Sequence, residues 1–291
     1  MNKDLTVGKP ERVLWRYCIP LLGSVIFQQL YNIADSLVAG KYVGKNALAA
    51  VGNSYEITLI YMAFAFGCNM GCSVIAAQFF GAKNYRKMKT TVYTTFIYSA
   101  VLCLILTLTG LFAGGALLHL IHTPADIFAD SKLYLDVYTG GLVFLFFYNI
   151  ATGIFSALGD SKTPFYANLI GLATNMILDP VLILGPGPFQ RFGAAGAAMA
   201  TVLAQVIVTM IMLFGVILQK KENVLKGLRL FVKIPFEYVQ GICKIGIPTA
   251  LQGMVYCFIS MVLTRMVAGF GPEAIATQRV GGQIESISWN T

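Results

Sequence analysis

Charged residues are scarce in this 291-residue chain. Asp, Glu, Lys and Arg make up 12% of it against 57% hydrophobic residues, and the mean hydropathy is +0.71. This balance excludes a water-soluble domain. Apolar runs near or above the length that crosses a bilayer recur along the chain, which is typical of a polytopic helical membrane protein. We therefore predict an all-α fold, a bundle of transmembrane helices.

Residues that carry catalytic chemistry are equally few. The two histidines, His119 and His122, lie at an expected outer helix end, and no nucleophile elbow or metal-ligand spacing occurs. All six cysteines fall in apolar segments without paired loop spacing, so we interpret them as small buried hydrophobes: Cys18, Cys68, Cys72, Cys103, Cys243 and Cys257. We accordingly expect neither an enzyme nor a cofactor.

The apolar runs divide into discrete spans. We predict spanning helices at 17–41, 49–80, 90–118, 128–157, 163–185, 194–218 and 245–270, with an eighth beginning near 274. Most Lys and Arg residues fall before the first span and in every second loop after it. The positive-inside rule then places the N-terminus in the cytoplasm. The net charge of +8 is explained by topology, without a nucleic-acid partner.

Two short segments repeat six helices apart. Ile19-Pro20 recurs as Ile247-Pro248, and Gly44–Ala49 recurs in similar form as Gly271–Ala276. Parallel repeats of this kind build two lobes around a central cavity in several secondary transporters. We expect a six-helix lobe over 1–219, a cytoplasmic connector over 220–244, and the first one or two helices of an incomplete second lobe over 245–291. Within the connector, 220–240 is either a helix lying on the membrane surface or a solvated tether.

Polar residues inside the spans mark a candidate site. Asp35 lies well inside the first span, where a carboxylate costs at least about 2.5–3.5 kcal/mol. In the fifth span, Asn175 and Asp179 are four residues apart and share one helix face. Pro180 follows and frees the carbonyl of Met176. These oxygens suit a cation site, and a proline kink capped by its neighbours is the alternative.

Depth supports the same site. Asp35 and Asp179 each lie about 9 Å below the outer end of their span, and Thr201 of the sixth span lies about 12 Å in. Two carboxylates in one apolar layer do not both stay ionised without a cation, so the pKa of one should rise. The layer is therefore predicted to take up and release a proton or a sodium ion.

A second group of residues is a candidate lining for a cavity that holds large organic molecules: Tyr31, Glu56, Asn149 and Met176. Ordinary helix packing is the alternative for each of them. For Glu56, a position at the membrane interface is equally compatible with the sequence.

Five segments together resemble the multidrug and toxic compound extrusion (MATE) family. They are IPLLGSVIFQQLYNIADSLVAGKYVGKNALAAVG near the N-terminus, then AAQFFGAKN, ALGDSKTP, NMILDP and GAAGAAMAT. The resemblance implies a multi-pass protein of the inner (plasma) membrane with two six-helix lobes arranged as an inverted V, the second lobe being incomplete here. It also implies a monomer when full length, embedded in the lipid bilayer, that exports cationic or amphipathic drugs in exchange for H⁺ or Na⁺.

The resemblance further implies roles for single residues. The coupling-ion site would consist of Asp35, Asn175, Asp179 and Thr201. The first three would be ligands of a bound Na⁺. Pro20 matches a proline at which the first helix bends, and Asn149 matches an Asn near the drug cavity. Gln252 and Tyr256 stand where one branch of the family has a Glu, which favours coupling through the first lobe.

Two alternatives remain from the sequence. One is a flippase for lipid-linked oligosaccharides, although the first-lobe spans offer no Arg or Lys for a pyrophosphate. The other is a truncated lobe that does not transport.

Overall fold

The described residues of the computed structural model are 9, 11–15, 17–27, 45–120, 123, 125–185, 192–218, 236–268 and 281. They are almost entirely helical and contain no strand, which confirms the predicted all-α class. Residues 11–15 and 17–27 are helical. The helices that follow are α2 (Lys45–Gly81), α3 (Tyr85–Leu120), α4 (Ala125–Gly140), α5 (Leu142–Ala157), α6 (Lys162–Leu184), α7 (Ala194–Leu218) and α8 (Phe236–Ala268).

Within the described ranges, five helices are long and apolar enough to cross a membrane, and α4 with α5 makes a sixth, bent span. The predicted spans at 49–80, 90–118, 163–185 and 194–218 are thereby confirmed. The expected single helix over 128–157 is instead broken at Gly141, where α4 and α5 meet at 48°. Two successive glycines, Gly140 and Gly141, place no side chains at this turn, and such pairs are a recognised cause of kinks.

Helix α8 begins at Phe236 and not at the expected residue 245. Pro235 stands just before it and Glu237 lies in its first turn, both favourable at a helix start. Residues 236–244, which the sequence assigned to the connector, therefore belong to the spanning helix. The rest of the connector and the eighth helix expected near 274 lie outside the described residues.

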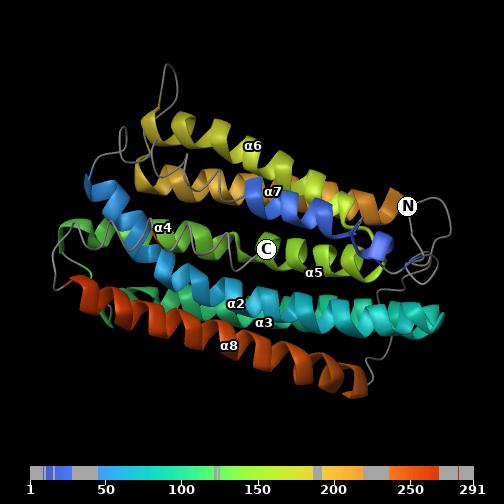
Figure 1. Ribbon diagram of the computed structural model, residues 1–291. Coiled ribbons are helices and arrows are strands. Elements are labelled where there is room, and N and C mark those ends of the chain that lie inside the picture. The colour runs from blue at the N-terminus through green and yellow to red at the C-terminus, as the bar shows by residue number, and fades with distance from the viewer. Residues whose placement is uncertain are drawn as a thin grey trace.

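Figure 1 shows the helices side by side along one common direction. Helices α6 and α7 lie at one side, α4 and α5 in the middle, and α2, α3 and α8 at the other. The Thr209 hydroxyl of α7 donates a hydrogen bond to the Phe144 carbonyl of α5 at 3.0 Å. Helix α7 thus lies between α6 and the α4–α5 span.

The helical residues 17–27 pack against α6 and the end of α5. The rings of Phe27 and Phe165 lie 6.3 Å apart, Gly23 faces Phe165, and the Tyr17 hydroxyl donates to the Ser156 carbonyl at 3.5 Å. Pro20 lies within this helical stretch. The segment that leads to Asp35 therefore starts beside the helix that carries Asn175 and Asp179.

Candidate functional site

Asn175 and Asp179 are buried on the face of α6 that packs against α7; each is 7% exposed. Gly171 of α6 faces Val208, and a methyl group added at Gly196 of α7 would lie 2.5 Å from the Leu182 carbonyl oxygen. Positions 171, 175, 179 and 182 recur at helical spacing, so they form one stripe. The predicted pairing of the amide and the carboxylate on one face is thus placed in a close helix–helix contact.

The residues of α7 opposite this pair are small. Counting inward from the two glycine contacts sets Ala200 across from Asp179 and Ala204 across from Asn175. Both alanines are buried. The part of α7 across from the polar pair therefore carries small residues, at a close contact between two membrane-spanning helices.

Pro180 lies inside α6, which continues to Leu184 and ends at Gly185 with a left-handed φ of 61°. Proline has no N–H, so the helix supplies no partner to the Met176 carbonyl. The Met176 side chain is 55% exposed and lies off the α7 stripe. The Met176 carbonyl oxygen is therefore a further candidate cation ligand, on the same turns of α6 as the side chains of Asn175 and Asp179.

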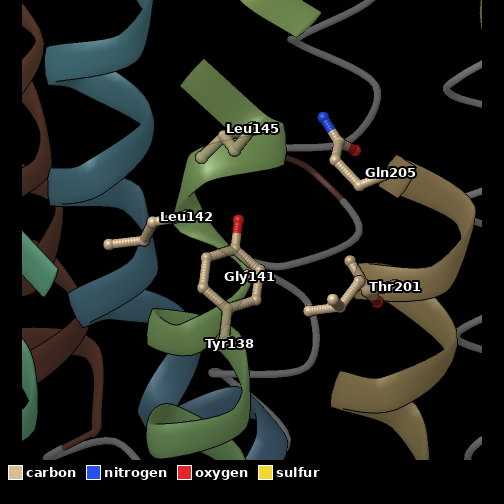
Figure 2. A pocket seen from close by; sticks show the side chains of 7 residues that line it. Tyr138, Gly141, Leu142, Leu145, Thr201 and Gln205 are labelled. Atoms are coloured by element: carbon tan, nitrogen blue, oxygen red, sulfur yellow. The ribbon is translucent and has the colours of Figure 1, made fainter. Parts of the chain in front are cut away.

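Thr201 lies at the same level of α7 as Ala200, opposite Asp179, but faces the bend between α4 and α5. A cavity of about 10 Å³ at this bend is lined by Tyr138, Gly141, Leu142, Leu145, Thr201, Val202 and Gln205. Figure 2 shows Tyr138 and Gly141 on one side of it and Thr201 and Gln205 on the other. Such a volume admits about one water molecule. The Thr201 hydroxyl donates to the Ala197 carbonyl at 3.0 Å.

The sequence did not single out Tyr138 or Gln205 as neighbours of Thr201. Their proximity depends on the bend at Gly141, where the Gly141 N–H contacts the Val137 and Tyr138 carbonyls at 3.2 and 3.0 Å. The successive glycines at 140 and 141 were the available signal for this break.

The remaining candidates are distributed differently. The Asn149 amide donates to the Leu145 carbonyl of its own helix at 2.9 Å. Tyr31 and Asp35 lie outside the described residues, as does the side chain of Glu56, whose backbone belongs to α2. The structure thus places Asn175 and Asp179 on one face of α6, whereas Thr201 lies on the side of α7 that faces the α4–α5 bend.

An open groove of about 560 Å³ follows the helical residues near the N-terminus, lined by Glu11, Leu14, Trp15, Cys18, Leu21, Leu22 and Val25. This size is within the range of sites for drug-sized ligands. The described part of its lining is mostly apolar and includes the Glu11 carboxylate. Among the described residues, no cluster of three His, Cys, Asp or Glu side chains arranged for a metal ion is found.

Comparison with known proteins places these features in context. The family profile MatE matches residues 20–181. The chain is 28% identical to the probable multidrug resistance protein YoeA of Bacillus subtilis, over 97% of this chain and 62% of that protein. It is 27% identical to an FAD transporter of Shewanella oneidensis, over 95% of this chain and 60% of the relative.

A solved structure has the same helix arrangement. It is the outward-facing conformation of a multidrug resistance MATE family transporter, with a TM-score of 0.88 and 26% identity over 99% of this chain and 63% of the other. The chain thus spans less than two thirds of the length of these proteins.

Proposed function

Because this chain belongs to the multidrug and toxic compound extrusion (MATE) family of transporters, we propose that it forms the ion-coupling part of a secondary antiporter. The antiporter exports cationic and amphipathic organic compounds in exchange for H⁺ or Na⁺. Members of the family are transporters and not enzymes, in agreement with the sequence prediction. The proposal assigns residues 1–219 to the first lobe and α8 to the start of the second.

One observation carries the proposal: a carboxylate and an amide are buried together inside a membrane-spanning helix. Asp179 and Asn175 are each 7% exposed within α6. A permanently ionised carboxylate there is costly, and it is typical of an ion pathway. Protonation or cation binding removes that cost, so the occupied and empty forms differ in charge within the membrane. A difference of this kind allows an ion gradient to drive a conformational change.

The ligands of the site are all oxygens. We assign the Asp179 carboxylate, the Asn175 amide oxygen, the Thr201 hydroxyl and Asp35, with the Met176 carbonyl freed by Pro180 as a further donor. Hard cations such as Na⁺ prefer oxygen ligands, and a carboxylate pair serves a proton equally well. Packing of Gly23 and Phe27 on Phe165 supports a position of the Asp35 segment next to α6.

We propose that the first helix bends at Pro20 when the site changes its charge. Proline weakens the helix at that point because it lacks an N–H and crowds the preceding turn. The groove of about 560 Å³ is lined by residues of this same helix. Bending at Pro20 would therefore reshape the groove and couple the ion to an organic ligand.

Substrate recognition is assigned to the groove and to Tyr31, Glu56, Asn149 and Met176. A described lining that is mostly apolar and includes the Glu11 carboxylate fits amphipathic cations. The FAD transporter among the relatives makes a dinucleotide the second candidate substrate. That substrate carries phosphates and needs basic residues, which the described lining of the groove lacks.

The protein is assigned to the inner (plasma) membrane, with a cytoplasmic N-terminus and as a monomer when full length. Lys83, Arg86 and Lys162 lie at the α2–α3 and α5–α6 turns, which antiparallel helices place on one side. That side is cytoplasmic by the positive-inside rule.

The deciding experiment is dye efflux from cells that lack their own pumps. Expression of the chain within its full coding sequence should lower accumulation of a cationic dye, and Asp179→Asn should abolish the effect. Efflux that survives both Asp35→Asn and Asp179→Asn would overturn the coupling site. Efflux by a longer form, but not by these 291 residues alone, would identify this chain as a non-transporting part.

A further inference from the structure

Helix α8 contacts α2 through backbone atoms. A methyl group added at Gly67 would lie 2.6 Å from the Gly246 carbonyl oxygen, and one added at Gly246 would lie 2.8 Å from the Gly67 oxygen. One turn away, a methyl group at Gly71 would lie 2.7 Å from the Ile242 oxygen. Small residues permit such close packing between membrane helices. The direct backbone contact holds α8 against α2 rather than against α3.

The space between α8 and α3 is correspondingly underfilled. A cavity of about 310 Å³ lies there, with walls from all three helices that include Phe64, Tyr98, Leu102, Gly246, Leu251 and Met254. Its lining is almost wholly apolar. The Tyr98 phenol in the described wall lies near the Cys243 thiol. The lining of the cavity therefore favours a ligand group without polar atoms.

The surroundings of the cavity decide what such a ligand is. Its walls lie within the apolar spans Ile57–Gly81, Tyr85–His119 and Phe236–Ser260. Leu251 at the rim is 50% exposed, and Ile105 on the neighbouring face of α3 is 52% exposed. At that depth the medium is lipid hydrocarbon. An empty apolar space would forfeit dispersion contacts with the atoms that line it, and lipid chains are the apolar groups at hand.

We propose that this cavity binds one acyl chain of a bilayer phospholipid, wedged between α3 and α8. The proposal is independent of the transport function, because it concerns only how α8 packs against α2 and α3. The bound chain supplies the contact that side chains of α3 and α8 leave out. It makes the attachment of α8 to the preceding helices dependent on lipid.

Tryptophan quenching by phospholipid with brominated acyl chains tests the proposal on the purified 291-residue chain. Trp15 and Trp289 are replaced by Phe, and Met254→Trp reports from the cavity. The matched control on the same helix is Phe258→Trp, because Phe258 is 68% exposed and does not line the cavity. In excess detergent, about one phospholipid per protein should quench Met254→Trp to saturation and leave Phe258→Trp unchanged.

A second arm narrows the cavity. Leu102→Phe with Leu251→Phe should lower the phospholipid that copurifies with the chain, measured by mass spectrometry of the intact protein. Val101→Phe with Val255→Phe, at positions 54% and 57% exposed, should leave it unchanged. Circular dichroism and gel filtration verify the fold of each variant, and the quenching arm needs no narrowed cavity.

Three outcomes would overturn the proposal. One is equal quenching of Met254→Trp and Phe258→Trp at every lipid ratio. Another is quenching by a brominated detergent at levels where phospholipid has no effect. The last is absence of quenching at Met254→Trp at every lipid ratio, either in the 291-residue chain or in a longer form of the protein, where it would mean that another segment fills the space.

Discussion

Asp179 and Asn175 share the α7-facing stripe of α6, one helical turn apart and each 7% exposed. The carboxylate therefore follows the amide by one turn on the same face of α6, and Ala200 and Ala204 are the buried residues at the corresponding levels of α7. In such a position the ionised form is stable only when a cation or hydrogen-bond donors approach it. The charge state of Asp179 becomes the variable on which the proposed coupling depends.

Asp179→Asn keeps the shape of the side chain and removes its charge. We expect gradient-driven efflux to fall by about tenfold or more, since a neutral amide does not exchange a proton or hold Na⁺ with comparable strength. The efflux that remains in Asp179→Asn should depend neither on pH nor on whether Na⁺ is replaced by choline.

Asp136→Asn is the matched control. Asp136 pairs with Lys132 on α4, and its side chain is 34% exposed. Efflux should stay within about twofold of the unmodified protein, because an ion pair that is partly open to solvent contributes little. A pH or Na⁺ response that persists in Asp179→Asn would exclude this residue as the coupling carboxylate.

The pair on α6 was predictable because its geometry is local. Residues four apart on a helix share a face whatever the rest of the fold does. The spans were predictable for a similar reason, since a long apolar run needs no partner to be recognised. The close approach of α7 was not predictable from α6, because it depends on Gly171 and Gly196 meeting Val208 and Leu182 across the interface.

Gly196→Leu tests that interface. Any side chain at this position would collide with the backbone of α6, because its Cβ atom would lie 2.5 Å from the Leu182 carbonyl oxygen. Backbone atoms cannot rotate away, so we expect a loss of about 1–3 kcal/mol in stability. Thermal unfolding in detergent should show a lower midpoint.

A glycine in open space provides the comparison. Gly81 has nothing within 4 Å of an added carbon, so Gly81→Leu should leave the midpoint nearly unchanged. Equal losses at both positions would refute a close α6–α7 contact.

The hydroxyl of Thr201 is the next target. Thr201→Val keeps the side-chain shape but removes the oxygen that lies at the level of Asp179. We expect a higher Na⁺ or H⁺ concentration for half-maximal efflux, by about tenfold, because one polar ligand is lost. The maximal rate should change less than this concentration.

Thr174→Val is closely matched to it. Thr174 on α6 also donates to the carbonyl four residues back, at 2.8 Å to Ile170, as Thr201 does to Ala197 at 3.0 Å. Thr174→Val should leave the ion dependence as it was. The same shift in both variants would point to a helix effect rather than a ligand.

The bend at Gly141 was not predicted, because the mean hydropathy of a window does not detect a break in a helix. By hydropathy, α4 and α5 together resemble one apolar span. The pocket of Thr201, Tyr138 and Gln205 lies at that bend, with Gly141 in its lining. The start of α8 was predicted at residue 245 because Lys244 was assigned to the connector. The structure places Lys244 within the helix. Both features have local signals in the sequence, the successive glycines 140 and 141 at the bend and Pro235 with Glu237 at the start of α8, which hydropathy alone does not weigh.

Gly141→Ala should therefore be harmful although Ala is the better helix former. A carbon added at Gly141 would lie 2.5 Å from Cγ2 of Val202, and β-branched side chains have little freedom to turn aside. The helix would gain propensity of about 1 kcal/mol, but α7 would be pushed away and the Thr201 pocket lost. We expect reduced efflux and a lower unfolding midpoint.

The neighbouring Gly140 has nothing within 4 Å of an added carbon, so Gly140→Ala should be neutral or stabilising. If Gly141→Ala also raises the midpoint without loss of efflux, then the bend is incidental and Thr201 acts without its pocket.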